Sequence, residues 1–407
     1  KKGVVLSAMV VSLTRLNGIY ERDMAVRMNL VGNNDLVIFI DSDNYTNSPT
    51  MIDEIQPIVD GLLGFGNYDM GHGYCTTDSG IAQVSSVCGS GKARGITGNP
   101  APVGDPFDVD YVAHEMGHQL GGNHTFSHSN EDNAVNYEPG SGSTIMAYAG
   151  ITSKDVQGNS DDYFHAGSIA QVQTNMASKT CDVETALTHG VPVVSSGGNF
   201  TIPKSTPFTL TGSATDTGGG SLTYCWEQYD DASGTGNLCS ISTGNPTGDN
   251  DCVPVGTKTA GPVFRSYQPT STPSRTFPRL ESVLNGSVST MGSEIAVEFL
   301  PSVARTLNFR LTARDNSVVG GGGLIQTPAG LILMPNESVA SVIGSLKIPS
   351  FTGTFFAARE YLQKVKIPLK RILLFTSIAF AASFTGSYCL TIVSNYYMKP
   401  IIFFVLV

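Results

Sequence analysis

The segment that decides the fold of this chain is residues 114–124, which read HEMGHQLGGNH and match the pattern H-E-x-x-H-x-x-G-x-x-H. On a helix, His114 and His118 lie one turn apart on the same face, so two imidazoles can bind one ion. Gly121 can adopt the positive φ that ends the helix and turns the chain, which returns His124 as a third ligand. Three nitrogen ligands leave one coordination position open for water, as in catalytic rather than structural zinc sites.

The glutamate inside this pattern has a chemical role of its own. Glu115 follows the first ligand, so it can hold a metal-bound water, take its proton and later pass that proton to a leaving amine. We therefore predict one Zn²⁺ bound by His114, His118 and His124, with Glu115 as the catalytic base. The alternative interpretation is a structural histidine cluster, since degenerate copies of catalytic motifs occur.

A second motif follows the third histidine. Residues 143–148 read STIMAY. With the histidine pattern, this segment resembles the methionine-containing turn of the metzincin zinc peptidases, and the resemblance implies that Met146 lies under the zinc. Three further stretches are more similar to the bacterial reprolysin-like, adamalysin-related peptidases: NGIYERD at 17–23, NYDMGH at 67–72 and DPFDVDY at 105–111. The resemblance covers about residues 3–185 and extends more loosely into the next domain.

The resemblance implies an α+β fold for residues 1–189, namely an α/β/α metzincin-type catalytic domain with a mixed, twisted sheet. In that layout a β-strand precedes the first helix. We therefore expect the N-terminal strand and the propeptide to be missing from this sequence, which would leave a sheet edge open. The family also implies a disulfide between Cys88 and Cys181, whereas the sequence alone does not fix the connectivity.

Substrate binding is expected along an edge strand. Residues 68–74 are the candidate, because in metzincins such an edge binds an extended peptide as an added strand. Tyr68, Met70 and His72 are therefore candidate substrate contacts, although His72 is more simply a structural or surface histidine. Thr125 departs from the animal adamalysins, which have aspartate after the last ligand, so we do not carry over their substrate-pocket details.

Other side chains near the motif have two interpretations each. Tyr148 lies two residues after Met146, and in astacin-like and serralysin-like metzincins a tyrosine at this spacing approaches the zinc and can stabilise the oxyanion. The alternative is a packed aromatic in the turn. His128 would close the open coordination position, so we interpret it as a spectator. A loop with three acidic residues is a candidate Ca²⁺ site, but solvated charges are the simpler interpretation because no ordered ligand pattern is present: Asp155, Asp161 and Asp162.

Composition and charge restrict the class of protein. At 407 residues, two or more domains are expected. Lys and Arg number 24 against 34 Asp and Glu, which argues against a nucleic-acid partner. A charged fraction of 14%, 45 glycines and seven cysteines without a C-x-x-C pair favour a bacterial extracytoplasmic protein, secreted or at the cell surface, with disulfides.

Hydrophobic spacing and turn residues predict the elements around the motif. We expect helices over residues 3–17 (ended by Gly18), 50–63, 107–120 (with Asp105 as N-cap) and 163–178. Strands are expected over 24–30, 36–40 and 92–97, and a loop over 75–91.

The rest of the chain divides into two parts. Residues 190–323 carry short alternating strands and are predicted to form an immunoglobulin-like β-sandwich, an accessory domain with Trp226 in a strand. Cys239 and Cys252 flank a loop there and are a candidate disulfide. Residues 324–407 are unassigned. A segment at 372–393 is apolar and long enough to span a bilayer, while a signal-peptide-like segment or a reading-frame error are alternatives, so membrane association stays open.

The sequence thus predicts a secreted zinc-dependent endopeptidase that acts on proteins or peptides. The alternative is a catalytically silent cell-surface binding or adhesion protein on a metzincin scaffold. The complete set of motif residues favours the enzyme. The substrate is not determined, because specificity depends on pocket loops rather than on the fold.

Overall fold

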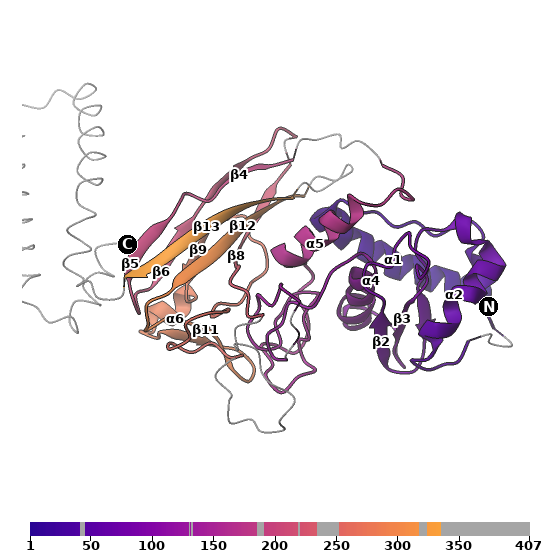
Figure 1. Cartoon of the computed structure of the whole chain (residues 1–407), viewed down its shortest axis with the longest axis horizontal. Coiled ribbons are helices and arrows are strands. Elements are labelled where there is room, and N and C mark those ends of the chain that lie inside the picture. Colours follow the sequence, from indigo (N-terminus) through magenta and orange to yellow (C-terminus); the bar gives the residue numbers. More distant parts are fainter. Residues whose placement is uncertain are drawn as a thin grey trace, which may run out of the picture.

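The computed structural model describes residues 1–40, 45–129, 131, 133–184, 191–218, 220–233 and 252–316, together with the backbone of 324–334. Helices surround a small sheet in the N-terminal region, and a β-rich region follows (Figure 1). This mixture agrees with the predicted α+β class. The candidate membrane segment 372–393 and Cys239 lie outside the described residues.

Besides the motif helix, the described N-terminal region contains one long helix, two shorter helices and three short strands. Its elements are α1 (Lys2–Met24), α2 (Met51–Leu63), β1 (Gly73–Cys75), β2 (Ser79–Ala82), β3 (Gly95–Gly98) and α5 (Ala166–Met176), with 3₁₀ turns at Asn34–Val37 and Phe65–Asn67. The strand order is β1-β3-β2, with β1 parallel and β2 antiparallel to β3. The sheet is therefore mixed, as the family resemblance implied.

The motif helix is one continuous helical run with a wider turn in its middle. It comprises α3 (Asp105–Phe107), a π-helical segment at Asp108–Ala113 and α4 (His114–Gln119). The predicted helix over 107–120 is thus confirmed. Its N-cap is Gly104 and not Asp105. The Asp105 carboxylate instead pairs with Arg15 of α1 at 2.8 Å, which explains why it does not cap its own helix.

Helix α1 packs against the motif helix and is longer than predicted. Its Ile19 and Tyr20 side chains are fully buried, and the Tyr20 hydroxyl donates to the Ala113 carbonyl at 2.6 Å. Burial of two large side chains contributes roughly 1.5–3 kcal/mol each, which outweighs the cost of about 1 kcal/mol for Gly18 within a helix. The predicted end at Gly18 is therefore wrong, and the helix ends in Ala25 at φ 56°.

Two predicted strands after α1 are also wrong. Residues 26–30 are irregular and residues 34–37 form a 3₁₀ turn. The backbone N–H and C=O of Met28 bond the Asn17 side chain of α1, both at 2.8 Å, so this segment pairs with a helix rather than with a strand. The predicted helix over 50–63 is confirmed by α2. The predicted strand over 92–97 is present as β3, which begins and ends later in the chain, at Gly95 and Gly98.

The outer side of β1 has no strand partner among the described residues. A pocket of about 370 Å³ lies beside it, between α1 and α2, and Leu13, Ile55 and Tyr74 are among its lining side chains. By length and composition alone, α1 is the one helix in the described ranges that could cross a membrane. Leu16, Ile19 and Tyr20 in its C-terminal half are buried, whereas Val4 and Val11 in its N-terminal half are exposed.

The second region is β-rich. Its elements are β4 (Val193–Ser195), β5 (Phe200–Pro203), β6 (Phe208–Thr211), β7 (Ser213–Thr215), β8 (Leu222–Gln228), β9 (Ser274–Phe277), α6 (Leu280–Leu284), β10 (Ser289–Met291), β11 (Ala296–Phe299), β12 (Thr306–Asp315) and β13 (Leu324–Met334). The main sheet has the order β5-β13-β12-β8, and three two-stranded sheets accompany it. Trp226 is buried in β8, as expected. Since β13 belongs to this sheet, the region extends past residue 323. An immunoglobulin-like topology stays a prediction.

One disulfide and one buried ion pair tie distant segments together. The bond between Cys88 and Cys181 confirms the predicted pairing. Asp23 of α1 and Arg314 of β12 are both fully buried, and their side chains meet at 2.7 Å. The same carboxylate accepts from the Phe164 N–H at 2.8 Å, and Arg314 donates to the Phe164 carbonyl at 2.9 Å. Burial alone would raise the pKa of Asp23, but Arg314 and Arg22 together lower it.

We expect Arg314→Ala to lower the free energy of unfolding of the full chain by about 3–5 kcal/mol, because it leaves the buried Asp23 without its main partner. Guanidinium denaturation measures this change. The matched control is Arg27→Ala, which removes an ion pair with side chains 66% and 30% exposed and should cost at most about 1 kcal/mol. Equal losses in the two variants would contradict a stabilising role of the buried pair.

Candidate active site

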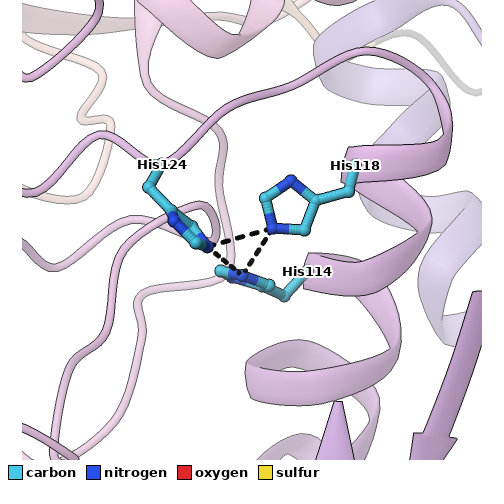
Figure 2. Close-up of side chains that lie close together, drawn as sticks. All are labelled: His114, His118 and His124. Atoms are coloured by element: carbon cyan, nitrogen blue, oxygen red, sulfur yellow. Dashed lines mark hydrogen bonds between the residues drawn. The ribbon is translucent and has the colours of Figure 1, made fainter. Parts of the chain in front are cut away.

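Three imidazoles converge at the C-terminal end of the motif helix. His114 and His118 project from successive turns of α4, and His124 returns from the loop beyond (Figure 2). The turn needs Gly121, whose φ is 113°. The Nε2 atoms lie 3.1 Å apart for His114 and His118, 3.0 Å for His118 and His124, and 3.2 Å for His114 and His124.

The outer nitrogen of each ring fixes its tautomer. The Nδ1 atoms of His114 and His118 lie 2.7 Å from the carbonyl oxygens of Ile145 and Gly122. A carbonyl only accepts, so each Nδ1 carries the proton and each Nε2 directs its lone pair inward. Nδ1 of His124 lies 2.6 Å from the Glu131 carboxylate and is arranged in the same way.

Three lone pairs that point at one another repel unless a cation lies between them. Zn–N distances of about 2.0–2.1 Å at tetrahedral angles place ligand nitrogens about 3.3 Å apart, close to the spacing found here. Burial, and next the neighbouring His124, lower the pKa of His118 to about 4, so this imidazole is neutral at pH 7, as a metal ligand must be. The residues therefore fit a zinc ion.

The catalytic glutamate candidate follows the first histidine directly on α4. Glu115 is 6% exposed, and its Oε2 has no hydrogen-bond partner among the described residues. Burial raises the pKa of Glu115 to about 8. Its other oxygen, Oε1, lies against Gly80 of β2, where an added Cβ would come within 2.5 Å. A buried carboxylate oxygen without a partner is costly, so a water or a cation at this position is the simplest explanation.

The methionine turn lies directly beneath the ligand helix. Met146 is fully buried, and a Cβ on Gly117 would lie 2.5 Å from its sulfur. Glycine at position 117 of the HEMGH segment therefore allows the sulfur to approach the helix backbone between the two histidines. The segment before Met146 also supplies the Ile145 carbonyl that orients His114.

The comparison with protein families agrees with this geometry. Residues 6–125 match the family described as metallo-peptidase family M12B, reprolysin-like. The three histidines of this segment are consistent with a metzincin zinc site. The match includes His114, Glu115, His118 and His124 and ends one residue after the third histidine. No curated protein matches the chain.

A second family model matches the opposite end of the chain. Residues 316–407 resemble the sulfite exporter TauE/SafE family. The match begins directly after β12 and includes the backbone of β13, which pairs with β12 in the second region. The rest of the matched segment lies outside the described residues.

Around the reprolysin-like centre, Tyr148 lies against the ligands while His128 does not join them. The ring centroid of Tyr148 is 5.5 Å from that of His114 and 4.5 Å from that of His124. The ring centroid of His128 lies 4.3 Å from that of Phe126, with the two rings tilted, and burial lowers the pKa of His128 to about 4. Among the described residues, the group that can hold a metal ion contains His114, His118 and His124 without His128.

The candidate substrate residues 68–72 contact other parts of the protein. Strand β1 begins only at Gly73, so a strand over 68–74 is wrong in its bounds. The Tyr68 hydroxyl donates to Asp60 at 2.6 Å, and both ring nitrogens of His72 are within 2.8 Å of Gln119 and Thr97. Met70 packs against the core around α1 and the motif helix.

The strand beside Glu115 is β2, in a segment predicted to be a loop. This strand is four residues long and contains a glycine, and it pairs with β3 through backbone groups. The sequence therefore shows no alternation of apolar and polar side chains that would predict a strand here. Glu131 was also missed. The sequence signal available for it was a carboxylate in the polar loop after the third ligand. Burial alone would raise the pKa of Glu131, but its hydrogen bond with His124 contributes to lowering it.

The candidate calcium residues bind protein donors instead. Asp155 accepts from Thr152, Asp161 pairs with Arg265 at 3.1 Å, and Asp162 pairs with Arg15 at 3.0 Å. The calcium interpretation is therefore unsupported, because these carboxylates point to separate partners.

We expect the full chain to bind one Zn²⁺ and His124→Ala to weaken this binding by more than about 100-fold, since loss of even an outer-shell partner costs 10–100-fold. Competition with a chromophoric chelator measures the affinity. His128→Ala is the matched control, because it removes a neighbouring histidine outside the ligand group, and it should change the affinity less than about threefold. A larger loss in the control would mean that the ligand set is misassigned.

Proposed function

We propose that this chain is a secreted zinc-dependent endopeptidase that hydrolyses peptide bonds with Glu115 as general base. The observation that carries the proposal is the convergence of three Nε2 atoms, two of them on the same helix as a buried Glu115 whose Oε2 has no hydrogen-bond partner among the described residues. The reprolysin-like family of residues 6–125 supports a zinc peptidase in general. The substrates are proteins or peptides.

The positions of the side chains indicate a chemical role for each residue. A bound zinc ion supplies Lewis acidity and lowers the pKa of its water to about 7. His114, His118 and His124 would hold it, with their outer nitrogens anchored. A cation bound nearby would favour the ionised form of Glu115, whose Oε2 would then accept a proton from the attacking water and deliver it to the leaving amine. The low exposure of Glu115 keeps competing bulk water away from this carboxylate.

The outer edge of β2, which has no strand partner among the described residues, is the proposed binding site for an extended peptide. This strand lies at the end of the sheet order β1-β3-β2, and its Gly80 contacts the side chain of Glu115. A peptide added to this edge would be bound through backbone hydrogen bonds, with its scissile bond near the glutamate. This proposal is an alternative to residues 68–72 as the substrate edge.

The proposed location is outside the cytoplasm. The disulfide between Cys88 and Cys181 supports an oxidising compartment. The TauE/SafE match leaves attachment to a membrane as a second possibility for the same extracytoplasmic location.

We expect Glu115→Gln to retain zinc and to lower kcat for peptide hydrolysis by about 10²–10⁴-fold, the usual loss when a general base is removed. The assay uses denatured casein and a mixed peptide library with and without a chelator, alongside zinc content. Glu281→Gln, at a side chain 72% exposed in the second region, is the control. Full turnover by Glu115→Gln would refute the mechanism. Zinc binding by the wild type without any cleavage would favour the silent binding protein.

We further propose that the Tyr148 hydroxyl stabilises the oxyanion, since its ring lies against two ligand imidazoles. Tyr148→Phe keeps the packed ring and removes the donor, so kcat should fall by about 10–1000-fold with little change in KM. Steady-state kinetics on one cleaved peptide measure both parameters. An unchanged kcat would leave Tyr148 as a packed aromatic of the turn.

A further inference from the structure

A buried carboxylate that the proposed mechanism does not use lies between the third ligand and the methionine turn. Glu138 is 1% exposed. In the described part of the chain its contacts are hydrogen bonds from neutral donors, and none of the ion pairs there includes it. Burying a carboxylate costs free energy unless hydrogen-bond donors surround it, so the burial of Glu138 depends on such donors.

Five donors surround this carboxylate. One oxygen, Oε2, accepts from the hydroxyls of Thr125 and Thr144, each at 2.5 Å. The other, Oε1, accepts from the backbone N–H of Ser143 at 3.0 Å, from that of Thr144 at 3.2 Å and from the Ser143 hydroxyl at 3.3 Å. Glu138 is thereby saturated with donors from two separate segments.

Each of these segments leads directly to the metal centre. Thr125 follows the ligand His124, and its backbone N–H donates to the Met146 carbonyl at 3.0 Å. Ser143 and Thr144 precede Ile145, whose carbonyl orients His114 at 2.7 Å. Glu138 thus joins the segment that carries the third ligand to the segment that holds the first ligand in its tautomer.

We infer that Glu138 is a positioning residue for the metal centre: its carboxylate sets the distance of His124 and of the methionine turn from the ligand helix. This inference rests on the proposed zinc site. An amide at this position retains the shape but has one acceptor oxygen, so its NH₂ group would face donors that now meet an oxygen. The segment of Thr125 and the segment of Ser143 and Thr144 would then move apart, and the three Nε2 atoms would no longer point at one metal position.

The same network would also stabilise the fold without any effect on the metal, so the test must separate the two roles. Stability is measured as the thermal midpoint of the metal-free protein. The role in positioning is measured as zinc affinity of the folded protein and as the visible absorption of bound Co²⁺, which reports ligand geometry independently of catalysis.

The experiment compares the full-length wild type with Glu138→Gln, Thr125→Val and the exposed control Glu281→Gln. We expect Glu138→Gln to weaken zinc binding by 10–100-fold, as outer-shell changes do, and to alter the Co²⁺ spectrum. Thr125→Val removes only the hydroxyl on the side of His124 and should weaken binding in the same direction by a smaller factor. The control should match the wild type.

The outcomes separate the inference from the proposed function. If Glu138→Gln folds and binds zinc within twofold of the wild type with an unchanged Co²⁺ spectrum, Glu138 has a structural role and the inference is overturned. If Glu138→Gln does not fold, Thr125→Val decides, and wild-type affinity in that variant overturns the inference. If the wild type binds no zinc, it is the proposed function that fails.

Discussion

Three imidazole nitrogens within about 3 Å of one another are the constraint on which the rest of the N-terminal region depends. Their lone pairs can point inward only if each outer nitrogen has an acceptor. Those acceptors come from different places: the Gly122 carbonyl from the turn after α4, the Ile145 carbonyl from the methionine turn and the Glu131 carboxylate from the intervening loop. The site is therefore assembled by a loop of more than twenty residues, and not by the helix alone.

That loop is held in place by the second region. The N–H of Gly140 donates to the Cys252 carbonyl at 2.9 Å, and the Tyr163 hydroxyl donates to Ser266 at 2.6 Å. Val156 packs in one apolar cluster with residues of the β-rich region. The region predicted to be an accessory domain thus forms one wall of the segment that carries the third ligand and the methionine turn. Its removal would expose buried polar groups of the N-terminal region such as Asp23.

The elements that sequence reasoning found and those that it missed differ in the kind of interaction that forms them. The motif helix and α2 have apolar residues at helical spacing and were found. Helix α1 extends past Gly18 because contacts with Ala113, distant in sequence, outweigh a local propensity. Strand β2 is a few residues long and is defined by backbone pairing with β3, so no side-chain pattern marked it.

The sequence by itself predicted the three histidines that converge in the structure, because the spacing of His114 and His118 on a helix and the turn at Gly121 are local properties of the backbone. It also determined the position of Met146 through family resemblance. Only the tertiary structure decided which strand faces Glu115, what anchors each imidazole and that Glu138 joins the ligand loop to the methionine turn. These features depend on contacts between residues that are far apart in the sequence. Such contacts are determined by the tertiary fold and not by local conformational preference.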